Sequence, residues 1–195
     1  MALDDSKTRA YGGGKSYSVL PTHSFRIPVD SAALVEHNVL NSEEMKQRVE
    51  SLEFTLSGAN GKPKGYILKS QFAVLDMIRG NNWERPIYFA VTTGPDSYMG
   101  LQSFFRLEGL AYRLVPIRYE QNDNPNAYGG VATKTMYSNV MDKWSWGGMD
   151  NVEDGIYMDE NNRRMVTNFR LQLSVLAEEL MKENDPDRAL DILEQ

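Results

Sequence analysis

The sequence predicts a mixed α/β fold, with a mixed sheet flanked by helices, that ends in a helical segment. Up to about residue 146, β-branched and aromatic runs of strand length alternate with stretches whose apolar residues recur every three or four positions. From residue 159 onward only the helical spacing is left. We therefore expect an α/β domain over residues 25–158 and a helical segment over residues 159–195.

The first elements follow a polar lead-in. Residues 1–24 contain three consecutive glycines and no amphipathic period, which predicts a flexible linker without a packed element. A strand is expected at residues 25–29, and Asp30 is a good N-cap for the short helix after it. Acidic residues near the start of residues 42–49 favour a second helix, and a strand at residues 52–56 completes this region.

The central elements alternate between strands and helices. A helix that begins at Ser70 has apolar residues at three-residue spacing and ends near Gly80. The other expected elements are a turn at residues 57–65, strands at 66–68, 87–92 and 111–117, helices at 98–107 and 136–146, and loops at 121–130 and 147–156.

The last segment is wholly helical. Asp159 is the predicted N-cap of a long helix, and a second helix is expected over residues 188–195. The spacing of leucines and of the small residues Ala177 and Ala189 is typical of a tetratricopeptide repeat, although an ordinary helical hairpin has the same requirements. A single repeat cannot bury both of its faces, so a repeat would predict further helices after Gln195.

Composition excludes several classes of function. The net charge of −6 and the pI near 5.0 argue against a nucleic-acid-binding protein, because neutralising phosphates requires a basic face. The absence of cysteine excludes disulfides and thiol catalysis. No apolar run approaches the length of about 18 residues that a membrane-spanning helix requires.

Three segments resemble ligand-binding motifs but lack the residues or the spacing that those motifs require. We therefore expect no cofactor and no metal. The Gly-Lys-Ser at residues 14–16 lacks the first glycine and the preceding strand of a phosphate-binding loop. The acidic loop at residues 150–155 has Val152 where a calcium ligand belongs. His23 and His37 are too far apart for a helix-borne metal pair.

Some residues are nevertheless candidates for contacts with a ligand or partner. The central aromatic residues could floor a sugar-stacking groove or form the core: Trp83, Tyr88, Tyr98, Phe104, Phe105 and Tyr112. Arg163 and Arg164 could bind an anionic ligand or a partner, or only flank a helix start. The candidate contact residues are Trp83, Arg85, Tyr98, Glu108, Arg163 and Arg164. No Ser, His and Asp set suggests nucleophilic catalysis, so no catalytic residue is assigned.

Four segments carry a family resemblance. Residues 81–90 read Asn-Asn-Trp-Glu-Arg-Pro-Ile-Tyr-Phe-Ala, and residues 107–116 read Leu-Glu-Gly-Leu-Ala-Tyr-Arg-Leu-Val-Pro. Together with residues 25–30 and 159–165, they resemble the soluble tail of a family of large bacterial polytopic membrane proteins of unknown function. That family is similar to protein O-mannosyltransferases.

The resemblance implies a domain on the periplasmic face, tethered through membrane helices upstream of this chain. The catalytic acids of such proteins lie between membrane helices, so this chain is expected to hold none. The expected function is that of an accessory domain that binds the acceptor protein of a membrane-embedded O-glycosyltransferase. The alternatives are a structural docking module for envelope proteins and a carbohydrate-binding domain.

Overall fold

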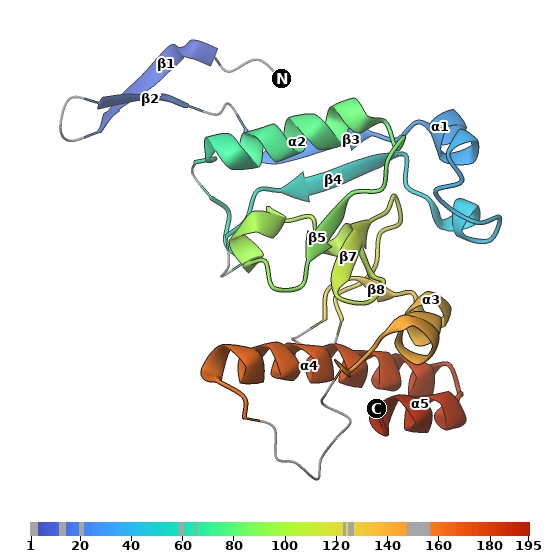
Figure 1. Cartoon of the computed structure of the whole chain (residues 1–195). Helices are drawn as coiled ribbons and strands as arrows, with labels where there is room; N and C mark the ends of the chain where they lie inside the picture. Colours follow the sequence, from blue (N-terminus) through green and yellow to red (C-terminus); the bar gives the residue numbers. More distant parts are fainter. Residues whose placement is uncertain are drawn as a thin grey trace. The chain divides into compact units, whose positions relative to one another are not determined.

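The computed structural model describes residues 4–11, 15–19, 22–58, 61–64, 66–122, 124, 127–147 and 157–195. The chain divides into two compact units (Figure 1). The first unit comprises Met1–Ile87, Thr93–Phe104 and Val115–Arg118, and the second comprises Tyr88–Thr92, Phe105–Leu114 and Tyr119–Gln195. The mixed α/β class with a terminal pair of helices is confirmed. The domain boundaries drawn from the sequence stay a prediction.

The first unit opens with two strand pairs. The backbone of β1 (Asp4–Tyr11) pairs antiparallel with that of β2 (Lys15–Val19), so two paired strands are present within the predicted lead-in, whose flexibility stays a prediction. The three glycines that suggested a linker lie outside the described residues. The second pair joins β3 (Ser24–Pro28) to β4 (Ser51–Thr55), where Phe25 stacks on Phe54 with ring centroids 5.6 Å apart.

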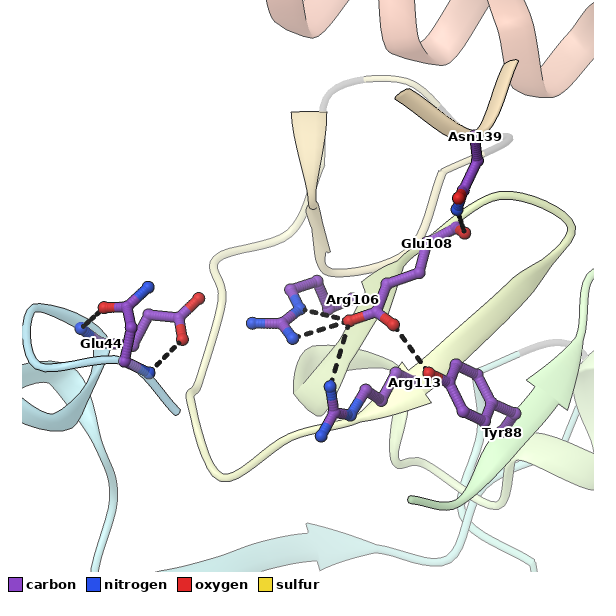
Figure 2. A network of polar contacts seen from close by, with 7 residues as sticks. Glu44, Tyr88, Arg106, Glu108, Arg113 and Asn139 are labelled. Atoms are coloured by element: carbon purple, nitrogen blue, oxygen red, sulfur yellow. Dashed lines mark hydrogen bonds and ion pairs between the residues drawn. The ribbon is translucent and has the colours of Figure 1, made fainter. Parts of the chain in front are cut away.

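Side-chain hydrogen bonds to backbone amides support the starts of the first two helical elements. Asp30 is confirmed as the N-cap of α1 (Ser31–Glu36), because its Oδ1 accepts a hydrogen bond from the amide of Ala32 at 2.9 Å. The helix predicted at residues 42–49 is only the 3₁₀ turn η1 (Glu44–Gln47). The side chains of Asn41 and Glu44 each accept a 2.9 Å hydrogen bond from the other residue's amide. Glu44 is labelled in Figure 2.

The predicted central helix is present but begins before Ser70. Leu68 is the N-cap of α2 (Lys69–Asn81), and the side-chain oxygen of Gln71 accepts from the Leu68 amide at 3.1 Å. The residues before it do not form the strand predicted at 66–68. Asn82 ends the helix in the left-handed conformation, with φ +41°.

The helix predicted at residues 98–107 is wrong. The chain instead forms the 3₁₀ turns η2 (Pro95–Tyr98) and η3 (Gln102–Phe104), then enters strand β6 (Phe105–Leu107). Between the two turns, Gly100 has φ +95°, and a Cβ there would collide with the carbonyl oxygen of Thr55. This close approach of the backbone to β4 requires glycine and breaks the helical run.

A four-stranded sheet forms the centre of the second unit. Its order is β5 (Tyr88–Ala90), β7 (Ala111–Leu114), β6 and β8 (Gly130–Val131). Only β6 and β8 run parallel. One face is apolar, because pleating places these buried residues on the same side: Phe89, Phe105, Leu107, Tyr112 and Leu114.

Helices make up the rest of the second unit. Instead of the helix predicted at 136–146, α3 (Thr133–Ser138) continues into the π turn η4 (Asn139–Lys143). Asp159 is confirmed as the N-cap of α4 (Glu160–Lys182), since its Oδ1 accepts from the Asn162 amide at 2.8 Å.

The last helix, α5 (Pro186–Leu193), pairs with α4 and is labelled beside it in Figure 1. Ala177 and Ala189 are buried, as expected for helices that approach closely. The tetratricopeptide assignment of this pair stays a prediction.

Candidate functional site

Three charged side chains of the second unit, Arg106, Glu108 and Arg113, lie on the face of the sheet opposite its apolar core. Tyr88 of β5 lies opposite Arg113 of β7, which lies opposite Arg106 of β6, and Arg106 in turn pairs with Gly130 of β8. These residues therefore form one row across the sheet. Glu108 follows Arg106 by two positions and so projects toward the same face (Figure 2).

The carboxylate of Glu108 is the centre of this row. Its Oε1 accepts hydrogen bonds from Arg106 Nε at 3.0 Å and Nη2 at 2.6 Å, and lies 3.6 Å from Arg113 Nη1. Its Oε2 accepts a 2.8 Å hydrogen bond from the hydroxyl of Tyr88. The Arg106 and Glu108 side chains are only 10% and 11% exposed, so this is a nearly buried ion pair in which both carboxylate oxygens are used.

A tight turn holds Glu108 in place. The amide of Glu108 donates to the carbonyl of Ala111 at 3.1 Å, which closes a two-residue hairpin loop. The first loop residue, Gly109, has φ +129°, and the ring of Trp144 lies 3.5 Å from where its Cβ would stand. Asn139 of the π turn donates to the Glu108 carbonyl at 3.3 Å, so η4 supports the hairpin.

The network changes the acidity of one member. Burial raises the pKa of the Tyr88 hydroxyl above its usual value of 10.0, as do the hydrogen bond to Glu108 and its negative charge, while the two arginines oppose the shift. Tyr88 therefore stays protonated and donates to Glu108 at neutral pH. Arg113 Nε is buried without a hydrogen-bond partner among the described residues.

The six candidate residues do not meet in one place. Trp83, Arg85 and Tyr98 belong to the first unit, where Trp83 is half-buried with φ +65°, Arg85 is exposed and Tyr98 is buried. Of the other three, only Glu108 lies in the network. Of its partners, Tyr88 was named only in the aromatic set, and Arg106 and Arg113 were not named as candidates. A Glu-Gly turn between two strand-like runs is the signal that could have found them.

Arg163 and Arg164 lie on the exposed first turns of α4. Arg163 Nε donates to the Met158 carbonyl at 3.0 Å, and Arg164 Nη2 donates to Asn161 Oδ1 at 3.4 Å. Both guanidinium groups thus contact neutral oxygens near the helix start.

Four of the central aromatic residues are buried in the core. Tyr98, Phe104, Phe105 and Tyr112 are at most 2% exposed, in agreement with the core alternative, whereas Trp83 is half-buried and Tyr88 is exposed. Aromatic side chains do gather near the surface elsewhere.

That gathering, here called the tryptophan cluster, consists of Trp144, Trp146 and Phe169. Their ring centroids lie 5.8 to 6.3 Å apart in edge-to-face arrangements, and all three side chains are partly exposed. Phe169 lies far from Trp144 and Trp146 in the sequence, so the sequence did not predict this cluster.

The described residues contain no group of three or more His, Cys, Asp and Glu side chains arranged to hold a metal ion. His23 and His37 are both exposed. The acidic loop at 150–155 and Gly14 of the Gly-Lys-Ser motif lie outside the described residues. Over the part of the chain that the structure describes, every helix is too short or too polar to cross a membrane.

Comparison with known proteins identifies a family. The TMEM260-associated domain 2 family matches residues 2–135, which include the elements up to β8 and the start of α3 but not α4 and α5. No match was found among curated proteins or among solved structures. The description agrees with the predicted relationship to a family of membrane proteins. Because the match covers more than half of the chain, the protein belongs to the TMEM260-associated domain 2 family.

Proposed function

We propose that this chain is an extracytoplasmic accessory domain of a membrane-embedded, protein O-glycosyltransferase-like protein, and that it binds the acceptor protein. The observation that carries the proposal is the family match over residues 2–135, because it makes the chain an associated domain of a membrane protein. The resemblance of residues 81–90 and 107–116 to the tail of O-mannosyltransferase-like proteins supports the proposed sugar chemistry and the proposed periplasmic location.

The geometry around Glu108 argues against a catalytic role for this residue. A general acid or base needs an oxygen that can reach the substrate. Both carboxylate oxygens of Glu108 already accept hydrogen bonds from the sheet, and the side chain is nearly buried. We assign Glu108 a structural role, which is to hold strands β5, β6 and β7 in register.

The test compares the parent membrane protein with a version that ends before Phe25 of this chain. Both are reconstituted with the sugar donor and offered a folded acceptor protein or a short peptide from its glycosylated segment. We expect deletion to slow transfer to the folded acceptor and to leave transfer to the peptide unchanged. Equal rates on the folded acceptor would refute the proposal, and a loss on both substrates would show damage to the membrane part.

The second candidate is a structural docking module for envelope proteins. It is favoured by apolar side chains that stay exposed on the paired helices: Met181 at 56%, Leu190 at 58% and Leu193 at 64%. An array of tetratricopeptide-like helices would cover such residues. If this candidate is right, the variant Leu190→Asp/Leu193→Asp of the parent will glycosylate its acceptor at the normal rate while losing its stable envelope complex.

A further inference from the structure

We propose that the first half of α4, residues 160–170, binds an acidic and partly apolar segment of the acceptor protein. This surface, here called the α4 overhang, lies outside the residues matched by the family. The inference rests on the proposed function for the identity of the partner. The chemistry of the partner is argued from burial and charge.

The two halves of α4 differ sharply in burial. All six buried residues of this helix lie in its second half, between Gln172 and Leu180. None of residues 160–170 is buried. Over these roughly three turns Phe169 contacts the rings of the tryptophan cluster but no side chain is fully buried, although isolated helices of this length are only marginally stable in water.

The packing face of α4 continues onto the overhang. Met165, Phe169, Gln172 and Leu176 follow one another at spacings of four, three and four, which places them on the same side of the helix. Gln172 and Leu176 are buried, whereas Met165 is 52% exposed. Phe169 lies between them and contacts the rings of the tryptophan cluster. Met165 thus extends an apolar face beyond the point where the protein itself covers it.

The overhang is basic in an acidic protein. It carries Arg163, Arg164 and Arg170 against the single acid Glu160, a surplus of two positive charges in a chain whose net charge is −6. Cations near a helix N-terminus oppose the helix dipole. The first two arginines therefore do not stabilise their own helix, and their guanidinium contacts are to neutral oxygens.

These features together define the partner. An apolar residue of the partner would cover Met165 beside the tryptophan cluster, and flanking Asp or Glu residues would pair with the arginines. The contact relies on arginine side chains, which form bidentate pairs with carboxylates. An acidic segment with interspersed large apolar residues fits this surface; a basic segment does not.

The experiment measures binding of the whole chain to short fluorescent peptides by anisotropy. One peptide alternates Glu with Leu, and a second alternates Lys with Leu. We expect saturable binding of the acidic peptide only, weakening as salt is raised. The variants Arg163→Glu/Arg164→Glu and Met165→Asp should each bind about tenfold more weakly.

The matched control is Lys46→Glu/Arg79→Glu, which changes the net charge by the same amount on exposed residues of the first unit. It should bind like the unchanged chain. Equal affinity for both double variants, or equal binding of both peptides, would overturn the proposal. Circular dichroism should show undiminished helix in Arg163→Glu/Arg164→Glu, because acids suit a helix start.

The same variants separate this inference from the proposed function. If deletion of the domain slows glycosylation but Arg163→Glu/Arg164→Glu in the parent does not, the α4 overhang is not the acceptor surface and the proposed function stands. If the acidic peptide binds as expected but deletion leaves glycosylation unchanged, the surface stands and its partner is not the acceptor.

Discussion

Two pairs of arginines in the second unit have opposite surroundings. Arg106 and Arg113 sit opposite each other on neighbouring strands, are at most 20% exposed and share the carboxylate of Glu108. Arg163 and Arg164 sit side by side in the sequence, are exposed and contact neutral oxygens. The same residue type holds a sheet together in one place and is available to a partner in the other. Burial and pairing, rather than residue identity, decide which role a charge takes.

The contrast between the two arginine pairs predicts the largest loss of stability for substitution of Glu108. Glu108→Ala removes the carboxylate from between two largely buried guanidinium groups and should lower the free energy of unfolding by about 3 kcal/mol. Urea unfolding followed by circular dichroism measures this change. The control Arg163→Ala removes an exposed charge and should change stability by less than about 0.5 kcal/mol. Similar losses in the two variants would mean that the Glu108 network does not stabilise the sheet.

Substitution in the hairpin turn next to Glu108 should destabilise the protein almost as much as Glu108→Ala. Gly109→Ala places a side chain at φ +129°, a conformation that L-residues rarely adopt, and should cost about 2 kcal/mol. Gly80→Ala is the matched control, because Gly80 lies in α2 with nothing within 4 Å of its Cβ position. The control should stabilise the protein by about 0.5 kcal/mol. If Gly109→Ala were equally harmless, the turn would not position the network.

Alkaline pH should weaken the Glu108 network, because Tyr88 loses the proton that it donates to Glu108. Because the folded pKa of Tyr88 is raised above 10.0, its contribution to stability is complete below pH 10 and is lost as pH rises through the folded pKa. In a pH titration followed by tyrosinate absorbance, we therefore expect a tyrosine that ionises above the usual pKa of 10.0 and that is absent from Tyr88→Phe. The pKa of Tyr137 is also raised, chiefly by its hydrogen bond to Asp191, and its late ionisation should remain in Tyr88→Phe. If Tyr88→Phe instead removed a tyrosine that ionises at the usual pKa of 10.0, the raised pKa of Tyr88 and its hydrogen bond to Glu108 would be contradicted.

Local chemistry was predictable from the sequence, and long-range geometry was not. Asp30 and Asp159 were identified correctly because a cap depends on the amides next to it. The helix predicted at residues 98–107 failed because Gly100 packs against Thr55, which lies far away in the sequence. The Arg106, Arg113 and Glu108 network depends on strand register, which sequence periodicity did not specify.

The smallest effect is expected for the exposed arginines Arg163 and Arg164, where substitution should raise stability rather than lower it. Arg163→Ala and Arg164→Ala should each stabilise the protein by about 0.3 kcal/mol at low salt, because each removes a cation from the positive end of the α4 dipole. Thermal unfolding at low and high salt measures the effect, which should fade as salt screens the dipole. Arg170→Ala lies deeper in the helix and serves as the control, with a smaller gain expected. A loss of stability in the first two variants would show that these arginines support the helix, and the contrast with Arg106 and Arg113 would then be one of exposure alone.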